Sequence, residues 1–176
     1  MSSIVVLVGN PQSASRTRLV AEEVARQLAD RGGAVVEPTI DLADVAGSLF
    51  RFPDAEIDAL LERVASADVL IVASPTYKAT YTGLLKAFLD RYGANGLAGV
   101  TAVPLLTIGG PGHALAVEHG LRPLLVEPGP STPTRGIAFP AGDADRREEI
   151  VASWLEDEWP RLAPALGSPV EPVRVG

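Results

Sequence analysis

The sequence predicts an α/β fold built on a doubly wound parallel β-sheet. Short runs of β-branched and other apolar residues alternate with segments of helical periodicity, and no internal repeat is present. A strict alternation of strands and helices implies a parallel sheet with helices on both faces. About five strands at this chain length fit the order 2-1-3-4-5.

The expected strands are the short apolar runs. Residues 4–8 form a continuous apolar strand of the kind that is buried on both faces. Pro38 lies within the second strand and predicts an edge position there, because proline cannot donate to a sheet ladder. The remaining strands are expected at residues 34–40, 68–73, 100–108 and 134–139.

Helical periodicity fills the segments between these strands. The first helix, about residues 15–31, carries an apolar stripe and is stopped by Gly32-Gly33. Pro123 lies inside a helix expected over about residues 112–126, where it cannot donate to the carbonyl of His119. A kink or π-bulge is therefore expected near His119. Three other helices are expected. One opens at Pro53-Asp54, and one runs from an Asp143 cap to Pro160. The third carries on one face Tyr81, Leu84, Leu85, Phe88 and Tyr92.

One domain is expected over residues 1–160, followed by a mobile tail over residues 161–176 that is rich in Pro, Gly and Ala. No apolar run reaches the roughly 18 residues that cross a bilayer. The first residues lack the basic segment of a signal peptide, so a cytoplasmic location is expected.

Composition excludes several function classes. Lys and Arg total 15 against 22 Asp and Glu, and the net charge of −7 disfavours nucleic acid and anionic membranes as partners. The absence of cysteine excludes disulfides, iron–sulfur clusters and thiolate nucleophiles. Two histidines are too few for a His-rich metal site, and no metal is expected.

Ligands of such sheets bind at the carboxyl ends of the strands, so the loops after strands one, three and four are the candidate site. The first loop, residues 9–17, is rich in hydroxyls and ends at a helix N-terminus, where free N–H groups favour an anion. Arg16 adds a charge suited to phosphate. The equal alternative is that Ser15 only caps the helix and Arg16 is solvated. The sequence lacks the glycine-rich phosphate motifs of dinucleotide-binding proteins and of NTPases. It also lacks the nucleophile elbow of hydrolases.

The loop after the third strand is the most specific segment. It reads Ser-Pro-Thr-Tyr-Lys-Ala-Thr-Tyr-Thr-Gly-Leu-Leu-Lys-Ala-Phe-Leu-Asp over residues 74–90. This run resembles the signature of the flavodoxin-like NAD(P)H-dependent FMN reductases, and most of all the reductase components of two-component sulfonate monooxygenase systems. The first loop resembles the phosphate loop of that family, and Gly109-Gly110 with the following helix resembles its Gly-Gly loop. The resemblance extends to about Phe139.

The resemblance implies FMN as cofactor, with a role for each matched residue. The FMN phosphate would be held by Asn10, Gln12, Ser15, Arg16 and Thr17. The ribityl chain and flavin edge would be wrapped by Pro75, Thr76, Tyr77 and Lys78, and the pyrimidine end approached by Gly109 and Gly110. No catalytic side chain is expected, because FMN carries the chemistry.

The match has departures. The family usually has Ser in place of Asn10 and Arg in place of Gln12, which implies weaker FMN binding with Arg16 as the main cation. His119 matches a residue that some members insert to form a π-helix at a subunit interface. With respect to catalysis, the simpler interpretation is favoured: His119 and His113 are surface residues with no role in the reaction.

Three functions remain open. The first is an FMN reductase that uses NADPH or NADH and supplies reduced flavin to a partner monooxygenase. The second is a quinone or azo reductase with tightly bound FMN. The third is a flavodoxin-type electron carrier, which the lack of a Thr-x-Thr-Gly-x-Thr loop and the 5% aromatic content disfavour. The resemblance also implies a homodimer or homotetramer.

Overall fold

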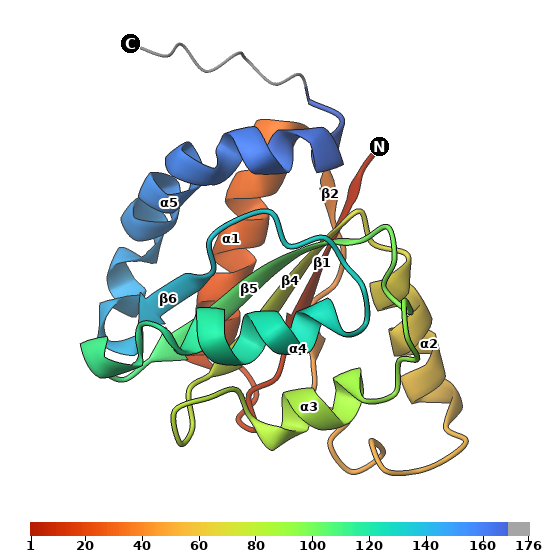
Figure 1. The fold of residues 1–176 in the computed structure, drawn as a ribbon. Helices are drawn as coiled ribbons and strands as arrows, with labels where there is room; N and C mark the ends of the chain where they lie inside the picture. Colours follow the sequence, from red (N-terminus) through yellow and green to blue (C-terminus); the bar gives the residue numbers. More distant parts are fainter. Residues whose placement is uncertain (169–176) are drawn as a thin grey trace.

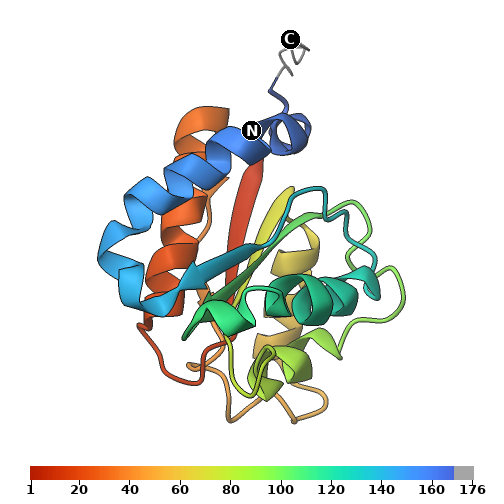
Figure 2. The ribbon, with the colours of Figure 1, turned by 60° about the vertical axis from the view of Figure 1, so that its left-hand side comes forward.

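A computed structural model describes residues 1–168 and shows a parallel sheet covered by helices on both faces (Figures 1 and 2). The strands are β1 (Ser3–Val8), β2 (Val35–Val36), β3 (Ile40–Asp41), β4 (Val69–Pro75), β5 (Thr101–Ile108) and β6 (Ile137–Pro140). The α-helices are α1 (Arg16–Gly32), α2 (Ala55–Ala65), α3 (Gly83–Leu89), α4 (Arg122–Val126) and α5 (Arg147–Leu162).

The strand order is β2-β1-β4-β5-β6, with β3 also paired to β1 and every pairing parallel. Segments β2 and β3 are the two ends of the single strand expected over residues 34–40. That strand is interrupted around Pro38, which lacks the N–H that a continuous ladder requires. Counting them as one strand, the predicted order 2-1-3-4-5 and the edge position of Pro38 are confirmed.

The core lies on both faces of the sheet, which is why β1 is apolar without alternation. Ile4, Val6 and Val8 pack with residues of α1 and α5. Val5 and Leu7 pack on the opposite face with residues of α2, α3 and α4. Burial on two faces leaves no solvent-facing position along the strand, so each residue of this run is apolar.

The expected end signals of α1 and α2 are confirmed. Ser15 caps α1, where its hydroxyl accepts from the Arg18 N–H at 3.3 Å, and Gly33 ends it in the left-handed conformation with φ 64°. Asp54 caps α2 in the same way. These local signals operate as expected because each needs only its own helix.

The helix expected over residues 112–126 is divided into three helical segments of different type. A short 3₁₀ turn, Pro111–His113, precedes a π-helix, Val117–Leu121, which continues into α4. The Arg122 N–H bonds to the Val117 carbonyl five residues back. Pro123 cannot donate at the position after this wide turn, so the π-bulge predicted near His119 is confirmed.

The C-terminal part corrects two expectations. Asp143 does not cap α5; it lies in a 3₁₀ segment, Ala141–Arg146, and α5 begins after it. Pro160 does not end α5, which continues to Leu162 and into a 3₁₀ turn, Ala163–Leu166. Leu162 and Leu166 are buried in the cluster that also contains residues of α1. This burial outweighs the loss of the one helical hydrogen bond for which Pro160 has no N–H. The tail expected from residue 161 is thus helical at its start, and residues 169–176 lie outside the described part.

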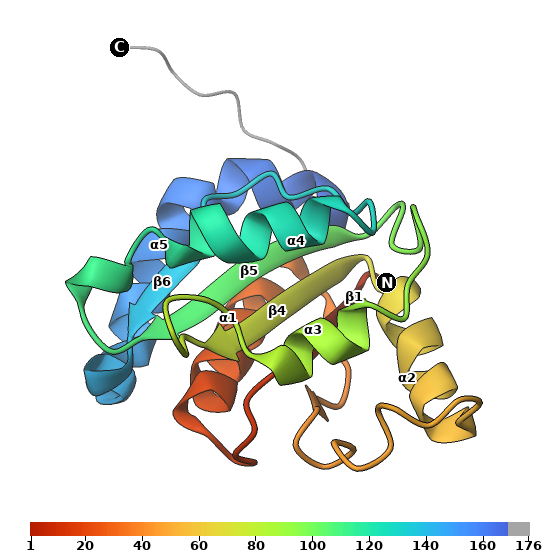
Figure 3. The same ribbon diagram turned by 60° about the horizontal axis from the view of Figure 1, so that its bottom comes forward.

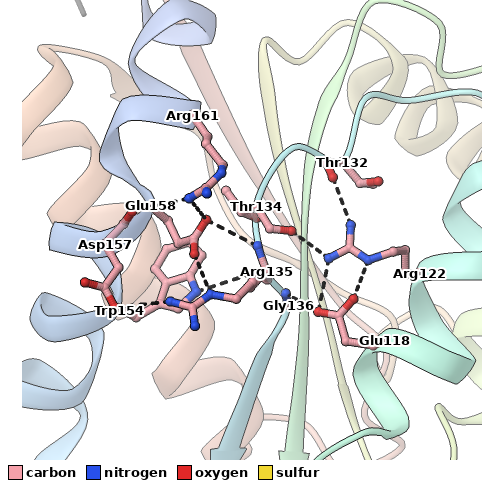
Figure 4. Close-up of polar contacts among 10 residues, drawn as sticks. All are labelled: Glu118, Arg122, Thr132, Thr134, Arg135, Gly136, Trp154, Asp157, Glu158 and Arg161. Carbon is pink, nitrogen blue, oxygen red and sulfur yellow. Dashed lines mark hydrogen bonds and ion pairs between the residues drawn. The ribbon is translucent and has the colours of Figure 1, made fainter. Parts of the chain in front are cut away.

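Two carboxylates clamp the connection from α4 to β6 (Figure 4). Glu118 of the π-helix accepts from Arg122 and from the Gly136 N–H, the latter at 2.6 Å. Arg122 donates in turn to the carbonyls of Thr132 and Thr134, at 2.8 and 2.6 Å. The π-helix therefore holds the segment that leads into β6.

The second carboxylate approaches the same segment from α5. Glu158 is fully buried and accepts from the Arg135 Nε at 2.8 Å and from Arg161 at 2.9 Å (Figure 4). Two guanidinium groups compensate a carboxylate that would otherwise be costly to bury. The start of β6 is thereby fixed between the π-helix and α5.

Buried hydroxyls fasten the carboxyl edge of the sheet. Thr82 caps α3 by accepting from the Leu85 N–H, and its hydroxyl donates to the Gly9 carbonyl at the end of β1. The Thr82 N–H donates to the Ser74 hydroxyl in β4 at 3.0 Å. A Cβ on Gly9 would lie 2.5 Å from the Leu85 Cβ, so α3 packs directly on this backbone. One threonine thus joins β1, β4 and α3.

We expect Thr82→Val to lower the free energy of unfolding by about 1–3 kcal/mol, because it removes the cap of α3 and leaves the buried Gly9 carbonyl without a donor. Urea unfolding followed by circular dichroism measures the change. Thr82→Ser keeps the hydroxyl and serves as the control. Equal losses for both variants would contradict the role of the hydroxyl.

We expect Glu118→Gln to destabilise the fold by about 1–2 kcal/mol near pH 7, because it weakens the bonds to Arg122 and Gly136. Arg122 holds the pKa of Glu118 below its usual value. The ionised group therefore stabilises the folded state above its unfolded pKa, and this contribution is lost as pH falls through the folded pKa.

The difference in unfolding free energy between wild type and Glu118→Gln should accordingly shrink below about pH 4. Glu149→Gln, which removes an exposed carboxylate from a surface pair, should have little effect at any pH. A Glu118→Gln difference that is independent of pH would refute the ionic part of the clamp.

Candidate functional site

The three loops singled out in the sequence meet at one edge of the sheet, where β1, β4 and β5 end (Figures 1 and 3). Thr107 of β5 contacts the other two. Its hydroxyl lies 2.7 Å from the Thr17 hydroxyl, and its carbonyl accepts from the Thr76 N–H at 2.9 Å. The loops after β1 and β4 are therefore attached to the same residue, two positions before Gly109.

The loop after β1, residues 9–17, is called the anion loop below. Asn10 is buried; its amide nitrogen donates to the Thr17 hydroxyl at 3.3 Å, and its oxygen accepts from the Gln12 N–H at 2.9 Å. The Thr17 side chain is buried as well. Two residues assigned to the phosphate by resemblance therefore direct their side chains into the protein, where they shape the loop.

The remaining residues of the anion loop present donors to solvent. Within residues 1–168, no acceptor is bonded to the backbone N–H groups of Arg16 or Thr17, which open α1. The side chains of Gln12 and Arg16 are exposed. Ser15 does cap α1, as the simpler interpretation held, but its hydroxyl hydrogen is not used by that bond. The positive end of the α1 dipole adds to this preference for an anion.

The loop after β4 forms a narrow hairpin. Tyr77 and Thr80 exchange two backbone hydrogen bonds, at 2.9 and 3.3 Å. Lys78 and Ala79 both adopt left-handed conformations, with φ 50° and 68°, as a two-residue type I′ turn requires. Neither residue is glycine, so the turn carries backbone strain of the kind that clusters at binding sites. The hairpin exposes Tyr77 and Lys78 above buried Pro75.

Thr76 carries an unpaired polar atom. Its hydroxyl oxygen is buried and has no hydrogen-bond partner among the described residues. A buried hydroxyl without a partner is costly, and natural proteins rarely keep one that no water or ligand satisfies. Arg63 and Thr134 carry the other such atoms within residues 1–168, so Thr76 is the one that lies in the three candidate loops.

Gly109 and Gly110 follow β5 with space around them. A Cβ built on either residue would meet no atom of residues 1–168 within 4 Å, and the Gly110 backbone is extended, with φ −176°. The protein's own packing therefore does not require glycine at these positions. Glycine at these positions would instead allow a ligand to approach the backbone closely.

Asp41 and Thr107 are parts of this site that reasoning from sequence missed. Asp41 follows one expected strand and Thr107 is the next-to-last residue of another, so both lie near the strand ends that signal function in such sheets. Asp41 is buried and bonded to the anion loop at Ala14. Their neighbours are far away in sequence, so a linear motif could not reveal them.

His113 and His119 are exposed. No group of three or more His, Cys, Asp or Glu side chains within residues 1–168 is arranged to hold a metal ion. In the same residues, no helix has the length and apolar character needed to cross a membrane.

The geometry offers an anion subsite, an adjoining hairpin with an aromatic ring, and an open glycine backbone.

Known proteins are similar to this chain in sequence and in fold. A family model described as NADPH-dependent FMN reductase matches residues 2–144. An FMN reductase (NADPH) from Pseudomonas putida is 35% identical over 128 residues, which cover 69% of this chain and 62% of that protein. A second P. putida protein, the NADH-dependent FMN reductase SfnF, is 34% identical over 126 residues, covering 69% and 68%.

Among solved structures, the apo form of an NADH:FMN oxidoreductase superposes with a TM-score of 0.84 at 35% identity, over 98% of this chain and 92% of that one. The chain thus spans less than two thirds of the length of the first relative above and most of the length of this structure. The family resemblance carried by the three loops is confirmed: this chain belongs to the NADPH-dependent FMN reductase family.

Proposed function

We propose that this protein is an NAD(P)H-dependent FMN reductase, which transfers a hydride from NADPH or NADH to FMN and supplies reduced flavin to a partner monooxygenase. The observation that carries the proposal is the anion loop, whose N–H groups at the start of α1 adjoin the hairpin that holds Thr76. Within residues 1–168, neither these N–H groups nor the Thr76 hydroxyl has a hydrogen-bond partner. Relatives named for NADPH and for NADH support both nicotinamides.

The residues present fit FMN. The phosphate would be held by the N–H groups of Arg16 and Thr17, the Ser15 hydroxyl and the Arg16 guanidinium, with Gln12 at the rim. The buried Thr76 hydroxyl, which has no partner within residues 1–168, would bond the ribityl chain. Asn10 and Thr17 act through their side chains by shaping the loop.

When bound, FMN supplies the ring that accepts the hydride. The protein's part is to bind and orient. Pro75, Tyr77 and Lys78 would border the flavin edge from the hairpin, and the Gly109-Gly110 backbone would approach its pyrimidine end, where N–H groups stabilise negative charge. No side chain needs to move a proton for hydride transfer, so we assign no catalytic residue.

The exposure of the anion loop favours FMN as an exchanging substrate over a permanently bound group. Gln12, Ser13, Ala14 and Arg16 are all exposed, so little protein covers the end at which the phosphate would bind. By resemblance we also propose that the protein assembles as a homodimer or homotetramer. A cytoplasmic location, and residues 1–160 as the FMN-binding domain, are further parts of the proposal.

We expect oxidation of NADPH or NADH, followed at the nicotinamide absorbance band, to depend on free FMN and to saturate with it. Arg16→Gln should raise the KM for FMN about tenfold and leave the KM for riboflavin unchanged, because riboflavin lacks the phosphate. Arg26→Gln, farther along α1, is the control. Failure to oxidise either nicotinamide with any flavin would refute the proposal. Flavin that copurifies, with turnover only on quinones or azo dyes, would favour the second function.

We expect Thr76→Val to act in opposite directions on stability and binding. Valine has the shape of threonine without the unpaired hydroxyl, so the free protein should gain about 1 kcal/mol of unfolding free energy. Flavin affinity should fall, because the ribityl chain loses a partner. Thermal unfolding without flavin and flavin fluorescence titration measure the two effects. A variant that loses both stability and affinity would show that the hydroxyl serves the fold.

A further inference from the structure

We propose that Asp41 is a positioning residue of the anion loop: its buried carboxylate fixes the loop conformation that distinguishes FMN from flavins without a phosphate. The inference rests on the proposed function and names a residue outside the three loops. Asp41 ends β3, beside β1 at the edge of the sheet.

The carboxylate joins two segments. Its Oδ2 accepts from the Ala14 N–H at 3.3 Å, in the middle of the anion loop, and its Oδ1 accepts from the Ala43 N–H at 3.3 Å. The side chain of Asp41 is only 1% exposed. A buried carboxylate of this kind is held in place from both sides, so its position is not free to follow the loop.

Ala14 needs such a support. Its φ is 52°, in the left-handed region that residues with a Cβ avoid. It lies just before Ser15 and the free N–H groups of Arg16 and Thr17, so its conformation sets the direction in which the chain enters α1. Because the bond from Asp41 is made to the Ala14 N–H itself, it favours this strained conformation over relaxed ones.

Asp41 also fixes the charge beside the site. The Arg18 guanidinium lies 3.7 Å from Asp41 and 2.8 Å from Glu22, which hydrogen-bonds it and raises its pKa. Arg18 is thereby occupied by carboxylates of the protein. Arg16 forms no ion pair with another residue of the described part, 1–168, and is left as the cation of the loop.

The two effects of Asp41 on a phosphate have opposite signs. Its hydrogen bond to Ala14 favours the binding conformation, whereas its negative charge repels a dianion nearby. Asparagine at this position removes the charge and keeps one acceptor oxygen, which can face the Ala14 N–H if the amide NH2 replaces the oxygen that accepts from Ala43. Alanine removes the charge and both acceptors. The two substitutions therefore separate positioning from electrostatics.

The test is the ratio of dissociation constants of riboflavin and FMN, measured by quenching of flavin fluorescence without any nicotinamide. Asp41→Ala should lower the preference for FMN about tenfold, the size expected for a misplaced hydrogen bond to a charged group. Asp41→Asn should keep or increase the preference. Asp44→Asn removes an exposed charge from the same segment and should change nothing.

A rescue isolates the loop conformation. Glycine adopts the left-handed region without strain, so Ala14→Gly added to Asp41→Ala should restore most of the preference for FMN. Ala14→Val, which leaves the carboxylate in place, should lower it, because a β-branched residue resists that conformation. This variant keeps the test valid if Asp41→Ala fails to fold.

Three results would overturn the inference: an unchanged ratio in folded Asp41→Ala, a loss in Asp41→Asn as large as in Asp41→Ala, or no effect of Ala14→Val. A wild-type protein that binds riboflavin as tightly as FMN would instead count against the phosphate site of the proposed function.

Discussion

The hydrogen bonds of Thr107 hold the candidate site together. Its hydroxyl meets that of Thr17 at the start of α1, and its carbonyl accepts from Thr76 at the base of the hairpin. The Thr82 hydroxyl makes a similar connection, from α3 to the end of β1. Since loops are the least constrained parts of a fold, these few buried bonds are what keep the three loops in one arrangement.

The apolar sheet makes such bonds effective. Both of its faces are buried, so hydroxyls at its carboxyl edge lie where water does not compete for them. Side chains of the anion loop divide accordingly. Asn10 and Thr17 point inward and shape the backbone, and Gln12 and Arg16 remain exposed with the free N–H groups. The proposed phosphate site is thus mostly backbone, supported from within.

Polar contacts also hold the region around the π-helix. Glu118 and Arg122 hold the connection into β6, and Glu158 holds it from α5 (Figure 4). Gly120 brings the π-helix so close to the hairpin that a Cβ there would lie 2.7 Å from the Thr80 hydroxyl. The hairpin beside the proposed flavin edge therefore packs against a helix that is itself clamped to the sheet.

The sequence by itself determined the strand order, the caps of α1 and α2, and the π-bulge forced by Pro123, because each depends on apolar periodicity or on a residue whose backbone chemistry acts locally. It also identified the family through three loops. Only the tertiary structure decided how those loops are joined: that Thr17 faces Thr107, that the Thr76 hydroxyl has no partner within residues 1–168, and that Asp41 bonds to Ala14. The path of α5 beyond Pro160 was likewise decided by burial against α1. These contacts join residues distant in sequence, and no local pattern encodes which of them will meet.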